Sequence, residues 1–251
     1  MSFVEMMKYA SFMGGGGTGG GGDVTEYIQL CEGSLTDFVA KKEMHSMADY
    51  LFCTSTALKT VDLSAYSGHV AGYAFANATN LETVILPNWS NNQIGDTTMP
   101  TFWNRAFQNC KSLKKIDTPY PFVVASGSPA VFQGCTSLES ATFPLGRFIN
   151  SGSCFSGCTA LGKIDINAGT FPGNMFQDCT ALLTLVIRAE FVSTLANVTA
   201  FSGTPFASGG TGGTVYVPAA LIEQYKTATN WSTLYAAGTC NFVAIEGSEY
   251  E

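Results

Sequence analysis

One short sequence pattern, the repeat phrase, recurs along this chain, and this repetition restricts the possible fold more than any other feature of the sequence. The phrase consists of an aromatic residue, a small residue three positions later, Leu six positions later, and apolar residues nine and eleven positions later. Six copies and a degraded seventh begin at the anchors Phe52, Phe75, Phe107, Phe132, Phe155, Phe176 and Phe206. The anchors recur about every 23 residues, with insertions before Phe107 and Phe206. Self-similarity at this period predicts a stack of structural repeats.

The spacing inside each copy predicts one helical turn followed by one strand. The anchor and the small residue share one face of a turn, while the apolar residues nine and eleven positions later share one face of a strand. This order is typical of leucine-rich-repeat solenoids, whose coils bury their apolar sides only against neighbouring coils. Because strand–crossover–parallel strand connections are almost always right-handed, we expect a right-handed α/β solenoid, mainly β, of about seven repeats.

A second apolar mark stands five positions before most anchors, at Met47, Val70, Phe102, Phe171 and Phe201. It is missing before two anchors, where Gly127 and Asn150 occupy the position. The register also predicts that replacing the anchor Phe155 by Ala destabilises the stack far more than replacing Phe143.

Three stretches resemble the BspA-like leucine-rich repeats, whose usual phrase is A-F-x2-C-x2-L-x2-I-x-I-P. They are "GYAFANATNLETVILP" (Gly72 to Pro87), "RAFQNCKSLKKI" (Arg105 to Ile116) and "VFQGCTSLES" (Val131 to Ser140). The stretch "TVYVPAALIEQYKTATNWSTLY", Thr214 to Tyr235, is similar to the strand, helix and Asn-Trp turn that close many of these arrays. The resemblance covers Met47 to Tyr235. It implies a relationship to surface adhesins, immunogenic surface proteins, and modules carried by phages of gut bacteria.

The sequence predicts four segments. Residues 1–22 form an N-terminal arm with a glycine-rich linker, residues 23–46 an N-terminal cap, residues 47–213 the solenoid and residues 214–251 a C-terminal cap. Within the last segment, Pro218 and the apolar spacing predict one amphipathic helix over residues 219–229. A closing strand over Cys240 to Glu246 and a solvated acidic tail follow.

The N-terminal arm combines an amphipathic stretch with the run "GGGGTGGGG", Gly14 to Gly22. The run is either a flexible linker, an arm that folds only against a partner, or a set of glycines packed closely against another backbone. The apolar residues expected to dock the arm onto a partner are Phe3, Met6, Met7 and Phe12. We therefore expect the chain to belong to an oligomer or a larger assembly.

Charge and hydropathy exclude several partners. The net charge is −7 and no basic run occurs, which argues against nucleic acid because phosphate binding requires clustered Lys and Arg. No segment approaches the ~18 apolar residues of a membrane span. The N-terminus has no apolar run of signal-peptide length. These features predict a virion component made in the host cytoplasm, with the bacterial cell surface as the alternative location.

The sequence contains no constellation that indicates catalysis, a cofactor or a metal. Cys110, Cys135, Cys158 and Cys179 share the small-residue position of the repeat, where Cys acts as a small buried hydrophobe. The only two histidines, His45 and His69, belong to no metal-binding spacing. Asp62, Asp117 and Asp165 occupy equivalent places in three repeats, which predicts an acidic row on the outer strand face. That row is either a solvated face or a site for a cation or a basic partner.

The insertion "NWSNNQIGDTTMPTFW", Asn88 to Trp103, is the longest departure inside the array. Inserted loops on one face of a solenoid often bind ligands. The candidate ligand-binding residues are Trp89, Asn91, Asn92, Phe102 and Trp103. The rings of Trp89 and Trp103 either contact a sugar or a protein or cover the core under a long loop. The sequence thus predicts a non-enzymatic binding or structural module, held on a phage particle by its arm, with a surface adhesin as the alternative.

Overall fold

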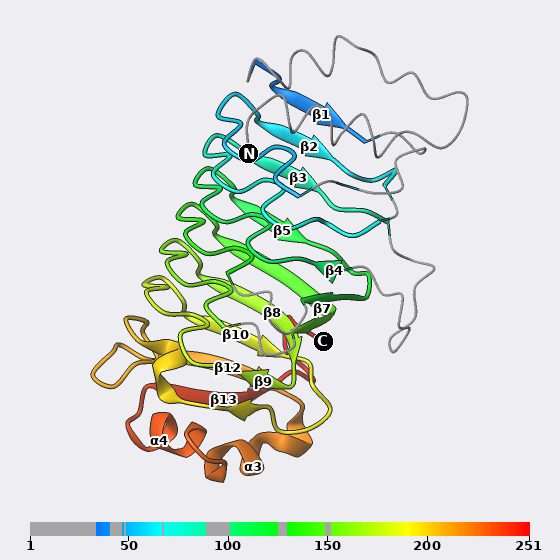
Figure 1. The fold of residues 1–251 in the computed structure, drawn as a ribbon. Helices are drawn as coiled ribbons and strands as arrows, with labels where there is room; N and C mark the ends of the chain where they lie inside the picture. The colour runs from blue at the N-terminus through cyan, green and yellow to red at the C-terminus, as the bar shows by residue number, and fades with distance from the viewer. Residues whose placement is uncertain are drawn as a thin grey trace.

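The computed structural model describes residues 34–40, 47, 49–66, 68–88, 101–124, 130–148 and 152–251. In this part, the chain winds into a mainly-β solenoid of about eight turns, with its few helices at the C-terminal end (Figure 1). The predicted docking residues Phe3, Met6, Met7 and Phe12 lie outside the described residues, as do Trp89, Asn91 and Asn92. No helix among the described residues is long and apolar enough to cross a membrane.

The main row of strands runs the length of the solenoid, and the paired strands in it are parallel. Its members are β1 (Asp37–Val39), β2 (Thr60–Asp62), β3 (Thr83–Ile85), β5 (Lys115–Asp117), the first part of β7 (Ser140–Phe148), β8 (Lys163–Ala168), β10 (Thr184–Ile187), β12 (Gly213–Val217) and β13 (Cys240–Ala244). The residues nine positions after the anchors are buried and are aligned within each sheet of this row: Val61 and Val84 in the first, and Ile116, Ala141, Ile164, Leu185 and Val215 in the second. The predicted strand register is confirmed, and β1 adds a coil strand before the first predicted copy.

The main row is divided between β3 and β5. Strands β1 to β3 form one sheet, whereas β5 pairs with β7 in the next sheet. Within the described ranges no ladder joins β3 to β5. The division falls where the insertion after Leu86 interrupts the repeat period, so a coil of unusual length separates two otherwise regular parts of the sheet.

A second row of shorter strands lies one corner further along each coil. It comprises β4 (Thr101–Phe102), β6 (Phe122–Val124), the end of β7, the end of β8, β9 (Thr170–Phe171) and β11 (Thr194–Leu195). Val124 and Phe148 supply the inward apolar residues that the sequence pattern lacked at Gly127 and Asn150. The apolar mark is therefore present in these coils but displaced along the chain by a few residues.

Strand β7 belongs to both rows because it turns the corner between them. Its pairing with β8 shifts register between Phe143 and Arg147. Gly146 lies in this corner, where a Cβ atom would stand 2.5 Å from Cε1 of Phe122. The absence of a side chain at Gly146 thus permits the close approach of β7 to β6.

The anchor phenylalanines form a continuous stack through the core. Neighbouring rings from Phe52 to Phe176 have centroids 5.1–5.8 Å apart and nearly parallel planes. The next ring in the stack is Phe201, which lies 5.5 Å from Phe176 at 21°, in the 3₁₀ turn Val198–Phe201. Our assignment of Phe206 as the seventh anchor was wrong. Extra residues follow Phe201, so Phe206 has the spacing to β12 that the repeat pattern requires. The ring that occupies the anchor position of the turn is nevertheless that of Phe201.

The four repeat cysteines form a second ladder beside this stack. Each Sγ donates to the carbonyl oxygen of the anchor in the preceding coil, at 3.0–3.2 Å, and all four side chains are fully buried. They are free thiols. Burial raises the pKa of Cys110 and Cys158 well above the ordinary thiol value, so they act as small core residues, as predicted.

The C-terminal cap covers the last coil with two helices where the sequence predicted one. A 3₁₀ turn, Ala219–Leu221, leads into α3 (Ile222–Thr227), and α4 (Trp231–Ala236) follows. Asn230, with φ 65°, separates the two helices. Trp231 is fully buried, and its Nε1 donates to the carbonyl oxygen of Ser193 at 2.7 Å. The predicted closing strand is confirmed as β13, which pairs with β12.

Candidate binding site

Two of the predicted ligand-binding residues can be placed, and only one of them can meet a ligand. Phe102 is 0% exposed, and its ring lies edge-on to Phe122 at 4.8 Å and to Phe107 at 5.9 Å. Its assignment to a binding site was wrong, because Phe102 is the second-row core residue of its coil. Trp103 is 47% exposed and lines a pocket.

This pocket, which we call the turn-face pocket, has a volume of about 510 Å³, within the ~300–1,000 Å³ of small-molecule sites. It lies on the turns that precede the anchors of the first three repeats. Its buried lining comes from Met47, Tyr66, Ala71 and Gly72, and its more exposed lining from Asp49, Tyr50, His69, Tyr73, Trp103 and Asn104.

A column of side chains from three successive coils forms one side of the pocket. The rings of Tyr50 and Tyr73 are stacked, with centroids 4.6 Å apart and an interplanar angle of 11°. On the next coil, Nη1 of Arg105 donates to the hydroxyl of Tyr73 at 2.6 Å, and its guanidinium carbon lies 5.5 Å from the ring centroid. Tyr73 is therefore held between an aromatic ring and a cation.

The backbone of this column adopts the left-handed region, with φ values of 64°, 56° and 54° at Tyr50, Tyr73 and Arg105. The equivalent residues of the following coils are Ala130, Ser153 and Asn174, which also have positive φ. This conformation costs about 1–2 kcal/mol for a residue with a side chain, and bulky residues rarely occupy it. Two tyrosines in this position are not required by the fold, since small residues serve the same turn elsewhere in the chain.

The polar groups of the pocket are held by backbone hydrogen bonds. Nδ1 of His69 accepts the N–H of Thr101 at 3.0 Å, so the neutral imidazole carries its proton on Nε2, which is a donor. Oδ1 of Asp49 accepts the N–H of Gly72 at 2.8 Å. Beneath them, the hydroxyl of Tyr66 donates to the carbonyl oxygen of His69 at 2.8 Å, and burial raises the pKa of Tyr66 to about 12.

Asn104 adds an acceptor whose hydrogen-bonding capacity is unused. Its side-chain Oδ1 is buried and has no hydrogen-bond partner among the described residues. Buried polar atoms are nearly always satisfied in folded proteins. The pocket thus combines aromatic surface with one carboxylate, one imidazole and one amide, which can bind a ligand by stacking and hydrogen bonding.

The part of the chain that the structure describes contains no group of three or more His, Cys, Asp and Glu side chains that could hold a metal ion. His69 bonds to the backbone of Thr101, which is not the partner that would activate a nucleophile.

A second pocket of about 490 Å³ lies on the strand face, in the division between β3 and β5. It is lined by both strands and by Tyr120, and Ile85 beside it is 49% exposed. Lys115 and Asp117 form an ion pair of 3.0 Å within it, with both side chains about half exposed. The charges of this exposed pair are therefore largely offset by each other and screened by solvent.

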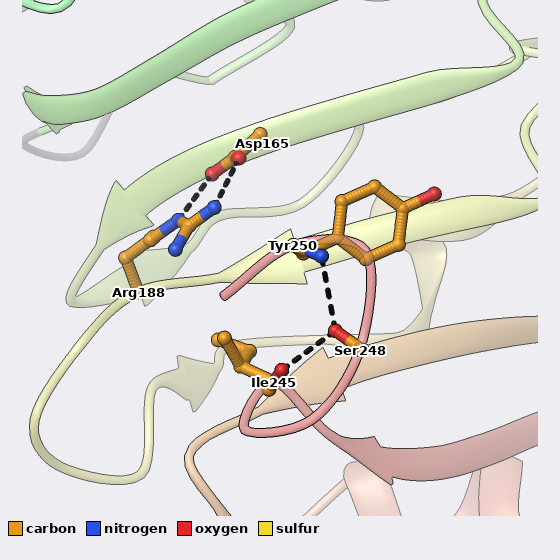
Figure 2. A network of polar contacts seen from close by, with 5 residues as sticks. All are labelled: Asp165, Arg188, Ile245, Ser248 and Tyr250. Carbon is orange, nitrogen blue, oxygen red and sulfur yellow. Dashed lines mark hydrogen bonds and ion pairs between the residues drawn. The ribbon is translucent and has the colours of Figure 1, made fainter.

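The predicted acidic row on the strand face is not formed. Asp117 is paired with Lys115, and Asp165 is only 4% exposed. Both carboxylate oxygens of Asp165 accept hydrogen bonds from Arg188, at 2.9 and 2.8 Å (Figure 2). The bond to Asp165 raises the pKa of Arg188. Two of the three members of the row thus serve local ion pairs.

The acidic residues of the tail, Glu249 and Glu251, are exposed as predicted, but the tail also turns back over the strand face near this ion pair. Ser248 accepts the N–H of Tyr250 at 3.1 Å and donates to the carbonyl oxygen of Ile245 at 2.6 Å (Figure 2). The ring centroids of Tyr250 and Tyr216 are 4.6 Å apart, and Nζ of Lys163 lies 4.2 Å from the centroid of the Tyr250 ring. The chain itself therefore occupies the strand face near β8 and β12, and the turn-face pocket remains the better candidate for a ligand.

Comparison with known proteins gives one sequence match and several weak structural ones. The family description "BspA type Leucine rich repeat region (6 copies)" matches residues 26–100 and 96–206. No curated protein shows significant similarity to the chain.

Among solved structures, the pneumococcal vaccine antigen PcpA is 15% identical, with a TM-score of 0.42, over 84% of this chain and 42% of its own length. A leucine-rich repeat protein from Bacteroides ovatus is 16% identical, with a TM-score of 0.22, over 81% of this chain and 88% of its own. A leucine rich cell surface protein from Faecalibacterium prausnitzii is 13% identical, with a TM-score of 0.24, over 86% and 89%. The chain thus spans less than half of the first of these proteins.

Proposed function

The chain belongs to the family of BspA-type leucine-rich repeat regions, and we propose that it works as a non-enzymatic binding module. Solenoids of stacked coils offer extended surfaces for recognition, and fold alone does not decide what is bound. The function must therefore be argued from the surface that this particular chain presents.

The observation that carries the proposal is the pair of stacked tyrosines in the turn-face pocket. Tyr50 and Tyr73 keep a backbone conformation that disfavours bulky residues. The same backbone conformation recurs in the later coils with smaller residues, so it is the choice of two large aromatic residues that distinguishes these two turns. Trp103 places a further exposed aromatic ring at the same pocket, and exposed aromatic rings are typical anchors of binding surfaces.

The proposed setting is a phage particle, with the N-terminal arm docking the solenoid onto a larger assembly. The sequence of the arm supports this setting, because apolar residues at helical spacing precede a glycine run that allows the solenoid to reorient. A bacterial cell-surface adhesin is the alternative setting for the same binding module.

The binding proposal is tested with the full-length chain carrying a fluorescent label and with intact cells of candidate host bacteria. We expect saturable binding that falls by at least about tenfold in Trp103→Ala. Phe191→Ala is the matched control, because Phe191 is 60% exposed but lies outside the turn-face pocket. A receptor-binding role would be contradicted if none of the tested cell types showed saturable binding.

The setting is tested separately by immunogold labelling with antibodies to the chain. Gold on purified phage particles would support the virion proposal, and gold on intact producer cells would support the adhesin. Labelling of neither structure would contradict both settings.

A further inference from the structure

We propose that the turn-face pocket binds a neutral pyranose ring of a glycan, with Trp103 as the stacking platform. This inference rests on the proposed binding function and adds the chemical class of the ligand. It follows from the arrangement of the rings, from the charges around the pocket and from the unused hydrogen-bonding groups.

The arrangement of the rings favours a ligand with one flat apolar face over a cation. An aromatic cage holds a cation between several free ring faces, but Tyr73 already has Tyr50 on one side and the guanidinium of Arg105 nearby. Trp103 and Tyr50, 47% and 45% exposed, supply the accessible aromatic surface. The C–H face of a pyranose carries a partial positive charge and matches the negative face of such a ring.

The charges around the pocket favour a neutral ligand. Asp49 places a carboxylate at the pocket, which disfavours a sugar acid or a phosphate by like-charge repulsion. Arg105 is the neighbouring cation, but it does not line the pocket, and its Nη1 donates to the hydroxyl of Tyr73. An anionic ligand in the pocket would therefore contact the carboxylate of Asp49 rather than this cation.

The polar groups suit vicinal hydroxyls, each of which can donate and accept. Asp49 uses Oδ1 for Gly72 and offers Oδ2 as an acceptor, while His69 offers Nε2–H as a donor. The buried Oδ1 of Asn104 has no partner among the described residues. Rotation of this amide toward the pocket would give it a hydroxyl partner, which the described part of the chain does not supply.

The test uses saturation-transfer NMR with the full-length chain and five soluble sugars. Four are neutral, namely the methyl pyranosides of glucose, galactose, mannose and N-acetylglucosamine, and the fifth is N-acetylneuraminic acid as an anionic comparator. We expect transfer to the ring protons of at least one neutral glycoside. Affinity should fall about tenfold in Trp103→Ala, as loss of a stacking ring implies, and should be unchanged in Phe191→Ala.

Two further variants separate binding from folding. Asp49→Asn keeps an oxygen for the N–H of Gly72 but removes the charge, and should weaken binding severalfold. Tyr50→Asn introduces a residue that tolerates the left-handed region, as Asn174 does in a later coil, so it should weaken binding while the chain stays folded. A far-UV circular dichroism spectrum checks the fold of each variant.

The inference is overturned if no neutral glycoside receives saturation, if Trp103→Ala binds as well as the original chain, or if only the anionic sugar binds. Its failure is distinguishable from failure of the proposed function. Cell binding that survives both Trp103→Ala and an excess of the four glycosides would retain the binding module and reject the sugar site. Glycoside binding without cell binding would retain the sugar site and reject the receptor role.

Discussion

The aromatic core makes a quantitative prediction that differs from the one based on the sequence pattern. The sequence favoured a far larger loss for Phe155→Ala than for Phe143→Ala. In the structure both side chains are 0% exposed. Phe155 stacks on Phe132 and Phe176 at 5.4 and 5.8 Å, while Phe143 contacts Phe122 and Phe132 at 5.2 and 5.8 Å.

Each replacement should therefore lower the free energy of unfolding by roughly 3–5 kcal/mol, the usual loss for a buried phenylalanine. The midpoint of thermal unfolding should fall by roughly 6–20 °C, since about 2–4 °C is lost per kcal/mol in a chain of this size. Urea titrations followed by circular dichroism measure the loss directly.

The control is Phe191→Ala, which should change the unfolding free energy by no more than about 0.5 kcal/mol, because Phe191 is 60% exposed. The argument from burial is refuted if Phe143→Ala costs less than about 1 kcal/mol, or if Phe191→Ala costs as much as the two core variants.

Three other predictions concern the thiols, the corner glycine and the strained tyrosine. Burial raises the pKa of Cys240 from 9.0 to about 12, so above pH 9 the unfolded chain loses this proton first and stability falls by up to about 1.4 kcal/mol per pH unit. Urea midpoints between pH 8 and 11 should show a smaller decline in Cys240→Ala, and an identical decline would contradict the assignment. Gly146→Ala should cost about 1–3 kcal/mol by forcing a Cβ against Phe122; an unchanged melting temperature would show that the corner can relax. Tyr50→Asn should change stability by no more than about 1 kcal/mol, because the relief of 1–2 kcal/mol of strain offsets the lost stacking. A large loss in its thermal melt would mean that the stacked rings are needed for folding.

Much of the fold follows from the sequence because the repeat phrase records contacts between neighbouring coils. The positions three, six and nine residues after each anchor must be small or apolar for the coils to stack. The prediction was wrong where chain length varies within a coil. Phe206 has the correct spacing to the following strand, but the ring that stacks on the preceding anchor is that of Phe201. The extra residues between the two made the sequence pattern point to Phe206. The second helix was missed because Asn is a common residue at the end of a helix. Here Asn230 instead lies between two helices, directly before the start of α4.

The candidate site was only partly predictable. Trp103 was identified because it lies in the longest insertion. The neighbouring Phe102 was included wrongly, although it also occupies the apolar mark five positions before Phe107, which is the position that buries it. Tyr50 and Tyr73 were missed. Both stand two positions before an anchor, and large aromatic residues at that place in two successive copies were a detectable signal. Their stacking and their backbone strain could be seen only in three dimensions.

The second row of strands also has a consequence for how such a chain can change over evolutionary time. Coils of different length can still stack on their neighbours. In each of them, β6 or the end of β7 places an apolar residue in the core at the point where the chain pairs with the adjacent coil again. Extra residues are therefore accommodated at the corners without disturbing the phenylalanine stack. Whole coils can be duplicated or lost as units, and their corners can diversify independently, so one scaffold can generate many surfaces at little cost to its foldability.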